Sequence, residues 1–322
     1  MRPRLITLAT SGHLAYQVEC LFKSMFYRLT RTLKYLKFNH QTRRILDTPR
    51  IRCGSGPATI VSMVAGYDVQ IYLLTVKALF RRLPGANIVA IIASDVSARQ
   101  RDLIREHLGA VEFVQNESLD SGKCQHRGTW ERLVYIADRS ASEYIIQMDC
   151  DILCLGPIPE VTECIAQNRA FALGEGIPKK PLCEYVKDGY ARGDDNIVIS
   201  FEKRAKEFHD SDKRLYLRAS SGFAGFAKGV INRSFIEDFH EEGRERFGAR
   251  WLEWGTEQIA SNFAVANSPD SFALPRPRYL NYDGGLITPE STLVHFLGYC
   301  RFKRGYFPYY ANREVDAQLE KA

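Results

Sequence analysis

The sequence of 322 residues lacks several motifs that would assign it to a common class. It has no run of about 18 apolar residues, which argues against a transmembrane helix. Neither a G-x-G-x-x-G nor a G-x-x-x-x-G-K-[ST] motif is present, so we expect no dinucleotide cofactor and no phosphate-cradling P-loop. The eight cysteines do not form the closely spaced pairs that bind structural zinc.

The chain also lacks a secretory signal at its start. Arg2 and Arg4 supply positive charge, but the apolar stretch Leu5–Ala9 is too short for the hydrophobic part of a signal peptide. The cysteines are scattered in mostly apolar surroundings, which indicates reduced thiols. We therefore expect a cytoplasmic protein.

The net charge of +6 is unevenly distributed. Residues 1–57 hold eleven Lys/Arg and two Asp/Glu, a net +9, whereas the rest of the chain carries a net −3. A nucleic-acid-binding domain would be basic over its own surface, so we expect no nucleic-acid partner.

The basic segment also predicts an amphipathic helix. Its apolar side chains recur at helical spacing at Leu14, Val18, Leu21, Phe22, Met25, Phe26, Leu29, Leu33 and Leu36. Such a helix packs on its own domain or on a second subunit, or lies on an anionic membrane surface through residues 13–38. Cys53–Pro57 is typical of a linker. We therefore predict a helical extension over 1–57 and a second domain over 58–322.

From residue 58 onward, apolar runs alternate with helical patterns. The runs are Thr59–Tyr67 with its turn, Asn87–Ala93, Val111–Val114 and Tyr144–Met148, and the helices are Leu73–Leu83, Ser97–Leu108 and Trp130–Arg139. Continuous apolar strands alternating with helices predict an α/β fold with a mostly parallel, Rossmann-like sheet flanked by helices. Ligands bind beyond the carboxyl ends of such strands.

The later part of the chain is less regular. Gly174–Ser200 is polar and predicts a lid or partner-binding insertion, with 174–215 as its widest extent. Ser220–Phe226 indicates a return strand whose small residues allow a close approach to the backbone. Thr256 is a candidate N-cap of a further helix. Apolar runs at Tyr279–Tyr282 and Thr292–Gly298 follow, and the second contains His295.

Two carboxylates follow the fourth strand at Asp149 and Asp151. If the chain stays extended through Cys150, both side chains project to the same side. Two like charges at this spacing need a cation or hydrogen-bond donors between them, and a hard divalent ion with oxygen ligands satisfies that need.

The residues from about Thr59 to Pro308 resemble the metal-dependent GT-A glycosyltransferases of family 8, which include glycogenin and bacterial lipopolysaccharide galactosyltransferases. The matching motifs, in order, are Val64-Ala65-Gly66-Tyr67, Arg132, Asp149-Cys150-Asp151, Ser220-Ser221-Gly222, Glu257-Gln258 and His295-Phe296-Leu297-Gly298-Tyr299-Cys300-Arg301. The chain departs from the family pattern in three places: Ser220 replaces Asn, Glu257 replaces Asp and Arg301 replaces Lys.

The resemblance implies a GT-A fold and transfer of a sugar from a nucleotide-diphosphate donor, with UDP as the nucleotide and retention at the anomeric carbon. It implies that Asp149, Asp151 and His295 bind the metal. The ligand mixture favours Mn²⁺ over Mg²⁺, which prefers all-oxygen shells.

The resemblance also implies where the donor lies. The nucleotide sugar would contact Val64, Ala65, Gly66, Tyr67, Arg132, Asp149, Ser221, Gly222, Gly298, Arg301 and Lys303. Glu257 and Gln258 would be the catalytic pair that positions the sugar or assists at the reacting carbon. The acceptor is open among a glycan, a lipid-linked sugar, a protein and a small molecule.

Three other functions remain to be compared. A haloacid dehalogenase-type phosphatase would use Asp149 as its nucleophile. A sugar-phosphate nucleotidyltransferase needs a Gly-rich, Arg-containing loop after the first strand, and Gly66-Tyr67-Asp68 offers none. A catalytically silent binding protein on the same fold would have no need for all of Asp149, Asp151 and His295.

Overall fold

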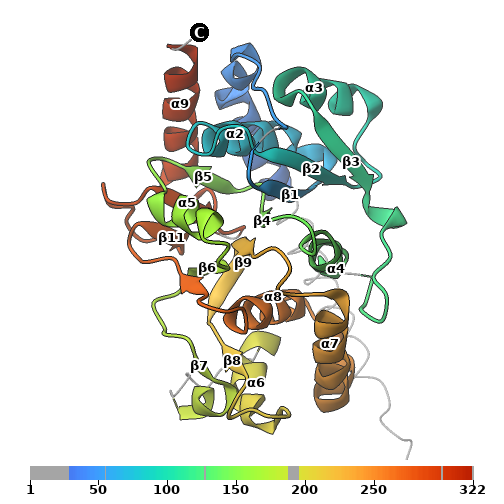
Figure 1. Ribbon diagram of the computed structural model, residues 1–322. Helices are drawn as coiled ribbons and strands as arrows, with labels where there is room; N and C mark the ends of the chain where they lie inside the picture. The colour runs from blue at the N-terminus through green and yellow to red at the C-terminus, as the bar shows by residue number, and fades with distance from the viewer. Residues whose placement is uncertain (1–28, 55, 127, 188–195, 299, 321–322) are drawn as a thin grey trace, which may run out of the picture.

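The computed structural model describes residues 29–54, 56–126, 128–187, 196–298 and 300–320 (Figure 1). Its centre is a seven-stranded sheet in the order β10-β6-β9-β4-β1-β2-β3. These strands are β1 (Thr59–Val64), β2 (Asn87–Ile92), β3 (Val111–Gln115), β4 (Ile145–Met148), β6 (Phe171–Gly174), β9 (Ala219–Phe226) and β10 (Phe272–Ala273). β1, β2, β3 and β4 pair in parallel, and β9 runs antiparallel between β4 and β6. This is the mostly parallel α/β sheet that the alternating pattern predicts.

The central strands are apolar on both faces because both faces are covered. In β1, Ile60 and Val64 point into one hydrophobic core, and Val61 points into a second core on the opposite face. Successive side chains on a strand alternate between faces, so a strand that is buried on both sides reads as a continuous apolar run.

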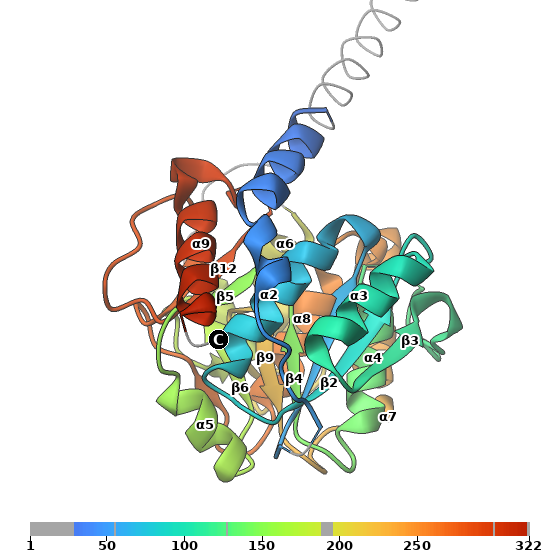
Figure 2. The same cartoon turned by 90° about the horizontal axis from the view of Figure 1, so that it is seen from above.

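Helices form the outer layers on both sides of the sheet (Figures 1 and 2). The first core contains side chains of α2 (Val69–Phe80), α3 (Ala98–Leu108), α5 (Pro159–Ala166) and α9 (Tyr306–Leu319). The second contains side chains of α4 (Trp130–Arg139), α6 (Ile197–Arg204), α7 (Arg233–Phe247) and α8 (Thr256–Ala266). α2 begins four residues before the predicted start at Leu73, because Val69 and Ile71 are already buried and packing extends the helix.

A second, three-stranded sheet in the order β11-β12-β5 lies beside the end of β4. It consists of β11 (Tyr279–Tyr282), β12 (Leu293–Phe296) and β5 (Ile152–Cys154). β5 and β12 are antiparallel, and their register pairs Ile152 with His295. This pairing places His295 directly beside Asp151, about 144 residues away in the sequence.

The chain between β4 and β5 does not stay extended, which corrects the geometry expected from sequence. Residues 150 and 151 form a turn, and the amide of Ile152 donates to the carbonyl of Asp149 at 3.3 Å. The turn is required because β5 leaves the central sheet to join the second one. Asp149 and Asp151 are therefore brought together by a turn rather than by strand alternation.

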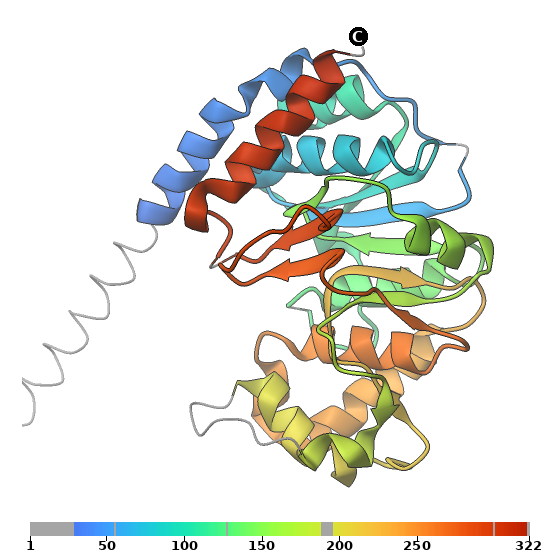
Figure 3. The ribbon, with the colours of Figure 1, turned by 90° about the vertical axis from the view of Figure 1, so that its left-hand side faces the viewer.

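The described part of the N-terminal segment contains a helix over residues 29–41, which lies beside α9 (Figure 3). Tyr35 and Phe38 are buried, and the ring of Phe38 stacks on Phe307 of α9 at a centroid distance of 4.6 Å. The predicted stripe from Leu14 to Phe26 lies outside the described residues. These contacts join the helix to the first core, while the predicted boundary at residue 57 stays a prediction.

The predicted insertion is partly structured. β7 (Lys180–Pro181) pairs with β8 (Leu215–Tyr216), and the 3₁₀ helix η4 (Leu182–Lys187) follows β7. Leu182, Tyr185 and Phe201 are buried in the second core. Residues 188–195 lie outside the described part, and the role of the segment as a lid stays a prediction.

Two further findings concern the cellular setting. Within the described ranges, no helix has the length and apolar character needed to cross a membrane. The seven cysteines in these ranges are all free thiols, as expected for reduced cysteines. The cytoplasmic location itself stays a prediction.

The helix α7 carries a fully buried histidine. The His240 ring packs edge-on against Trp130 of α4 at a centroid distance of 4.6 Å. Burial, together with the nearby Arg244, lowers the pKa of His240 to about 4. The folded chain therefore holds this imidazole neutral at a pH where the unfolded chain protonates it.

We predict that His240 makes the fold sensitive to acid. Because the folded-state pKa lies below the unfolded value of about 6.5, stability falls as the pH drops from about 6.5 toward 4. In urea denaturation, the wild type should lose about 2–3 kcal/mol more than His240→Phe between pH 7 and 4. Equal pH profiles for wild type and His240→Phe would contradict the prediction.

Candidate functional site

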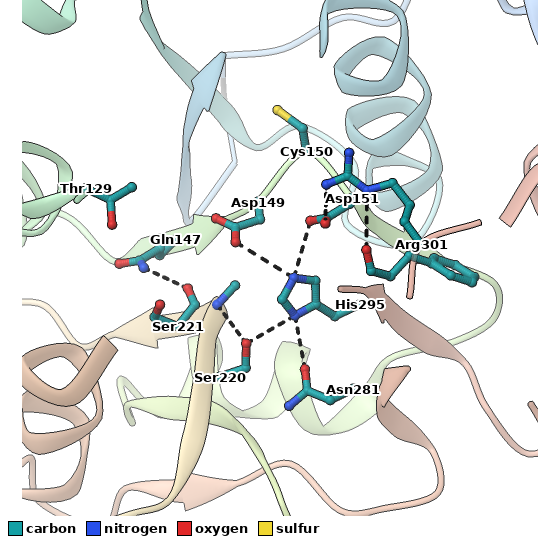
Figure 4. A network of polar contacts seen from close by, with 12 residues as sticks. Thr129, Gln147, Asp149, Cys150, Asp151, Ser220, Ser221, Asn281, His295 and Arg301 are labelled. Carbon is teal, nitrogen blue, oxygen red and sulfur yellow. Dashed lines mark hydrogen bonds and ion pairs between the residues drawn. The ribbon is translucent and has the colours of Figure 1, made fainter. Parts of the chain in front are cut away.

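Asp149, Asp151 and His295 form a compact cluster at the carboxyl end of β4 (Figure 4). One potential ligand atom from each residue lies within 4.8 Å of the others. Nε2 of His295 is 3.3 Å from Oδ1 of Asp151 and 3.8 Å from Oδ2 of Asp149. Asp151 and His295 are buried, whereas Asp149 is partly exposed. The three residues predicted as metal ligands are therefore adjacent.

Each carboxylate also has an arginine partner. Arg132 of α4 donates to Oδ1 of Asp149 at 2.6 Å, and Arg301 donates to Oδ2 of Asp151 at 2.6 Å. Arg301 also donates to the hydroxyl of Tyr35 on the helix over residues 29–41. The two carboxylates are therefore held by cations on their outer sides and keep an oxygen each toward His295.

The other nitrogen of His295 is held by polar side chains. Nδ1 lies 3.0 Å from Oδ1 of Asn281 and 3.1 Å from Oγ of Ser220 (Figure 4). An amide oxygen only accepts, so Nδ1 carries a hydrogen and donates to Asn281. In the neutral imidazole, the lone pair is then on Nε2 and points at the two carboxylates. This is the tautomer that binds a metal through Nε2.

The electrostatics of the cluster favour a positive charge between the three groups. Burial alone would raise the pKa of Asp151, but His295 and Arg301 hold it well below its usual range. Burial would lower the pKa of His295, but Asp151 and then Asp149 raise it. A proton on Nε2 would face the Asp151 carboxylate at 3.3 Å, and a divalent cation would take the place of that proton. Two carboxylates and one imidazole are a donor set that could hold a divalent metal ion.

Glu257 of α8 lies beside this cluster and is almost completely buried. Its carboxylate accepts hydrogen bonds from Thr129 at 2.9 Å, Gln147 at 3.0 Å and Ser221 at 3.2 Å. The Arg132 guanidinium lies 3.8 Å away. Burial raises the pKa of Glu257, and Arg132 and Thr129 oppose that rise. Through these contacts the Glu257 carboxylate orients the side chains of Arg132 and Ser221.

Most predicted site residues line one cavity of about 680 Å³. They are Arg132, Asp149, Asp151, Ser221, Gly222, Glu257, Gln258, His295, Gly298 and Arg301. The other predicted site residues lie outside this cavity. Val64 is in the core, and Ala65 beside it is half-buried. Gly66 and Tyr67 line a neighbouring groove, and Lys303 lines an adjacent pocket. Met63 of β1 and Asp68 of the turn after it lie in the cavity wall instead.

Sequence reasoning missed several residues of the site. Asn281 orients His295, and its only signal was its position in an apolar run. Asp68 lies 4.0 Å from Arg301, and burial raises the pKa of its carboxyl to about 6 although Arg301 opposes this. Trp254 lines the cavity with 82% of its surface exposed. Arg31 and Tyr35 line it from the N-terminal helix, and no motif marked them.

Comparison with solved structures identifies the fold. The apo structure of the bifunctional glycosyltransferase WbbM has a TM-score of 0.50 at 10% identity, covering 82% of this chain and 51% of that one. The glycosyltransferase GlyE of Streptococcus pneumoniae TIGR4 gives 0.47 at 12% identity, covering 82% and 63%. The galactosyltransferase LgtC, solved with donor and acceptor sugar analogs, gives 0.45 at 10% identity, covering 80% and 95%.

The chain thus has the GT-A fold, as the WbbM comparison shows, and it spans about half the length of that structure. Neither a protein-family model nor a curated protein sequence matches the chain. Identities near 10% show the fold and leave the reaction to be argued from the site.

A close approach of the His295 ring to β9 explains why residue 222 of that strand is glycine. A Cβ added at Gly222 would overlap the imidazole of His295, whereas a Cβ at Gly298 would meet no atom within 4 Å. The requirement for glycine at residue 222 is therefore steric.

We predict that Gly222→Ala destabilises the fold by about 1–3 kcal/mol, because the His295 ring or the backbone of β9 has to move. Gly298→Ala, the matched control in the same cavity wall, should change stability by less than about 0.5 kcal/mol. Urea denaturation measures both. The prediction fails if Gly222→Ala is as stable as wild type.

Proposed function

We propose that this chain is a metal-dependent glycosyltransferase that moves a sugar from a nucleotide-diphosphate donor, with UDP as the nucleotide. The observation that carries the proposal is the cluster of Asp149, Asp151 and His295 at the carboxyl end of β4, within a 680 Å³ cavity. A GT-A fold with such a cluster is suited to hold a metal-bound diphosphate.

The cluster would act on the leaving group of the reaction. Asp151 and His295 would bind Mn²⁺ directly, and Asp149 would bind the metal and the donor ribose. When bound, the ion would supply Lewis-acid stabilisation to the departing diphosphate. Arg132 and Arg301 lie beside the cluster and would add positive charge near the leaving group.

The sugar would lie on the other side of the cavity, toward α8. The three donors to Glu257 occupy its carboxylate, so we propose that it orients Arg132 and Ser221 rather than attacking the sugar. Gln258, next to it in the cavity wall, would contact the donor sugar. Retention at the anomeric carbon remains part of the proposal. The exposed ring of Trp254 at the same wall offers a flat surface on which a saccharide could stack.

A membrane-surface role for the N-terminal helix is also part of the proposal. Leu29, Leu33 and Leu36 are 57%, 56% and 61% exposed and are spaced for one face of the helix. Tyr35 and Phe38, on the opposite face, are the residues that pack on the domain. Exposed leucines on a helix with Lys34 and Lys37 suit the surface of an anionic membrane.

We predict that a nucleotide sugar and Mn²⁺ stabilise the chain together. A ligand at about 100 times its Kd raises the free energy of unfolding by about 2.7 kcal/mol. A thermal-shift screen of UDP-, GDP- and other nucleotide sugars, with and without Mn²⁺, measures this and identifies the donor. Asp151→Asn should lose the Mn²⁺-dependent shift and at least about 99% of donor turnover, because it removes a charged metal ligand.

The control is Asp102→Asn, which neutralises a well-exposed carboxylate on α3 and should behave as wild type. Full donor turnover in Asp151→Asn would overturn the metal site. A trapped aspartyl-phosphate on Asp149, without any nucleotide-sugar turnover, would favour the phosphatase alternative instead.

A further inference from the structure

A second cavity lies between the N-terminal helix and the domain. Its volume is about 670 Å³, within the range of small-molecule sites. Its walls are formed by the helix, Leu46, the turn after β1, and side chains of α2 and α3. The helix residues in the lining are Arg31, Thr32, Tyr35, Leu36 and Asn39. We call this cavity the helix groove. Leu36, Leu46, Val69 and Leu103 give it a largely apolar lining.

The helix groove adjoins two other surfaces. Leu36 belongs both to its wall and to the exposed face that carries Leu29 and Leu33. Arg31 and Tyr35 belong to its wall and also to the wall of the cavity that contains Asp149 and Asp151. The exposed leucines, the groove and the candidate active site therefore adjoin one another.

A positive charge marks the junction of the two cavities. Arg31 donates to the hydroxyl of Tyr67 at 3.3 Å, and its guanidinium lies 5.4 Å from the Tyr67 ring centroid and 5.6 Å from that of Tyr35. The two rings contact each other edge-on at 5.5 Å. These aromatic contacts hold the guanidinium at the point where the apolar lining ends. An anionic group at this point would be attracted by it.

We propose that the helix groove binds the hydrocarbon chain of a lipid-linked phosphate, and that the acceptor of the transferred sugar is a molecule of this class. The apolar walls take the chain, Arg31 meets the phosphate, and the saccharide beyond the phosphate reaches the catalytic cavity. The assignment of this molecule as the acceptor rests on the proposed glycosyltransferase function, whereas the binding of a lipid phosphate does not.

Tyr67 has a different role in this proposal from the one that the resemblance implies. Half of its surface is exposed, and it lines the helix groove rather than the cavity around Asp149. It would hold Arg31 and border the lipid instead of stacking on a nucleotide base. A donor base in the helix groove is therefore the competing occupant.

Binding of dodecyl phosphate to the full chain, measured by calorimetry below its aggregation concentration, tests the proposal. Dodecyl phosphate should bind at least about tenfold more tightly than inorganic phosphate, because apolar burial adds to the charge interaction. Leu36→Glu and Leu46→Glu, which change exposed leucines of the groove, should each weaken binding at least about tenfold. Leu286→Glu, at an equally accessible leucine that is 69% exposed and outside the groove lining, should not weaken it.

Two further measurements separate the possible outcomes. Arg31→Gln should weaken the binding of dodecyl phosphate but not of dodecanol, and UDP with Mn²⁺ should not displace dodecyl phosphate. Displacement by UDP would overturn the proposal and assign the groove to the donor. Equal binding by wild type, Leu36→Glu and Leu46→Glu would also overturn it.

The two proposals can fail separately. If dodecyl phosphate binds as expected but no nucleotide sugar does, the lipid-phosphate site is supported and the glycosyltransferase function is contradicted. If a nucleotide sugar binds and dodecyl phosphate does not, the glycosyltransferase function is supported and the proposal of a lipid-linked acceptor is contradicted. In the variant Leu46→Glu, Mn²⁺-dependent binding of the nucleotide sugar should match that of wild type.

Discussion

The site depends on the placement of the His295 imidazole between two carboxylates at the end of β4. Asp149 and Asp151 repel each other in partly and fully buried positions, and such a pair persists only with positive charge or donors around it. Arg132 and Arg301 neutralise the outer oxygens, and His295 faces the inner ones. Any cation that enters between them finds ligands already oriented.

The second sheet positions that imidazole. β5 begins directly after Asp151 and pairs with β12, so the same turn that ends β4 also aligns His295. Asn281, on the neighbouring strand β11, fixes the ring tautomer, and Gly222 on β9 leaves space for the ring. Three strands that are distant in the sequence thus converge on one side chain.

The N-terminal helix is connected to the same centre through Arg301. This guanidinium bonds to Asp151 on one side and to Tyr35 of the helix on the other. A helix that appeared from sequence to be an appendage therefore contributes walls to both the catalytic cavity and the helix groove. The helix has one apolar face packed on the domain and one exposed apolar face with Leu29, Leu33 and Leu36.

The amino-acid sequence by itself predicted the parallel strands β1 to β4, the helices between them and the Asp149–Asp151 pair, because continuous apolar runs and helical spacing are local patterns. The order of the strands and the second sheet came only from the tertiary structure. The sequence also pointed to His295 through motif order. Only the tertiary structure decided the role of Thr256, which is not an N-cap: it begins α8, and its hydroxyl accepts from Trp130. The same holds for Asn281, Asp68, Arg31 and Tyr35. Their positions depend on contacts between segments far apart in the chain, and such contacts leave no periodic trace in the sequence.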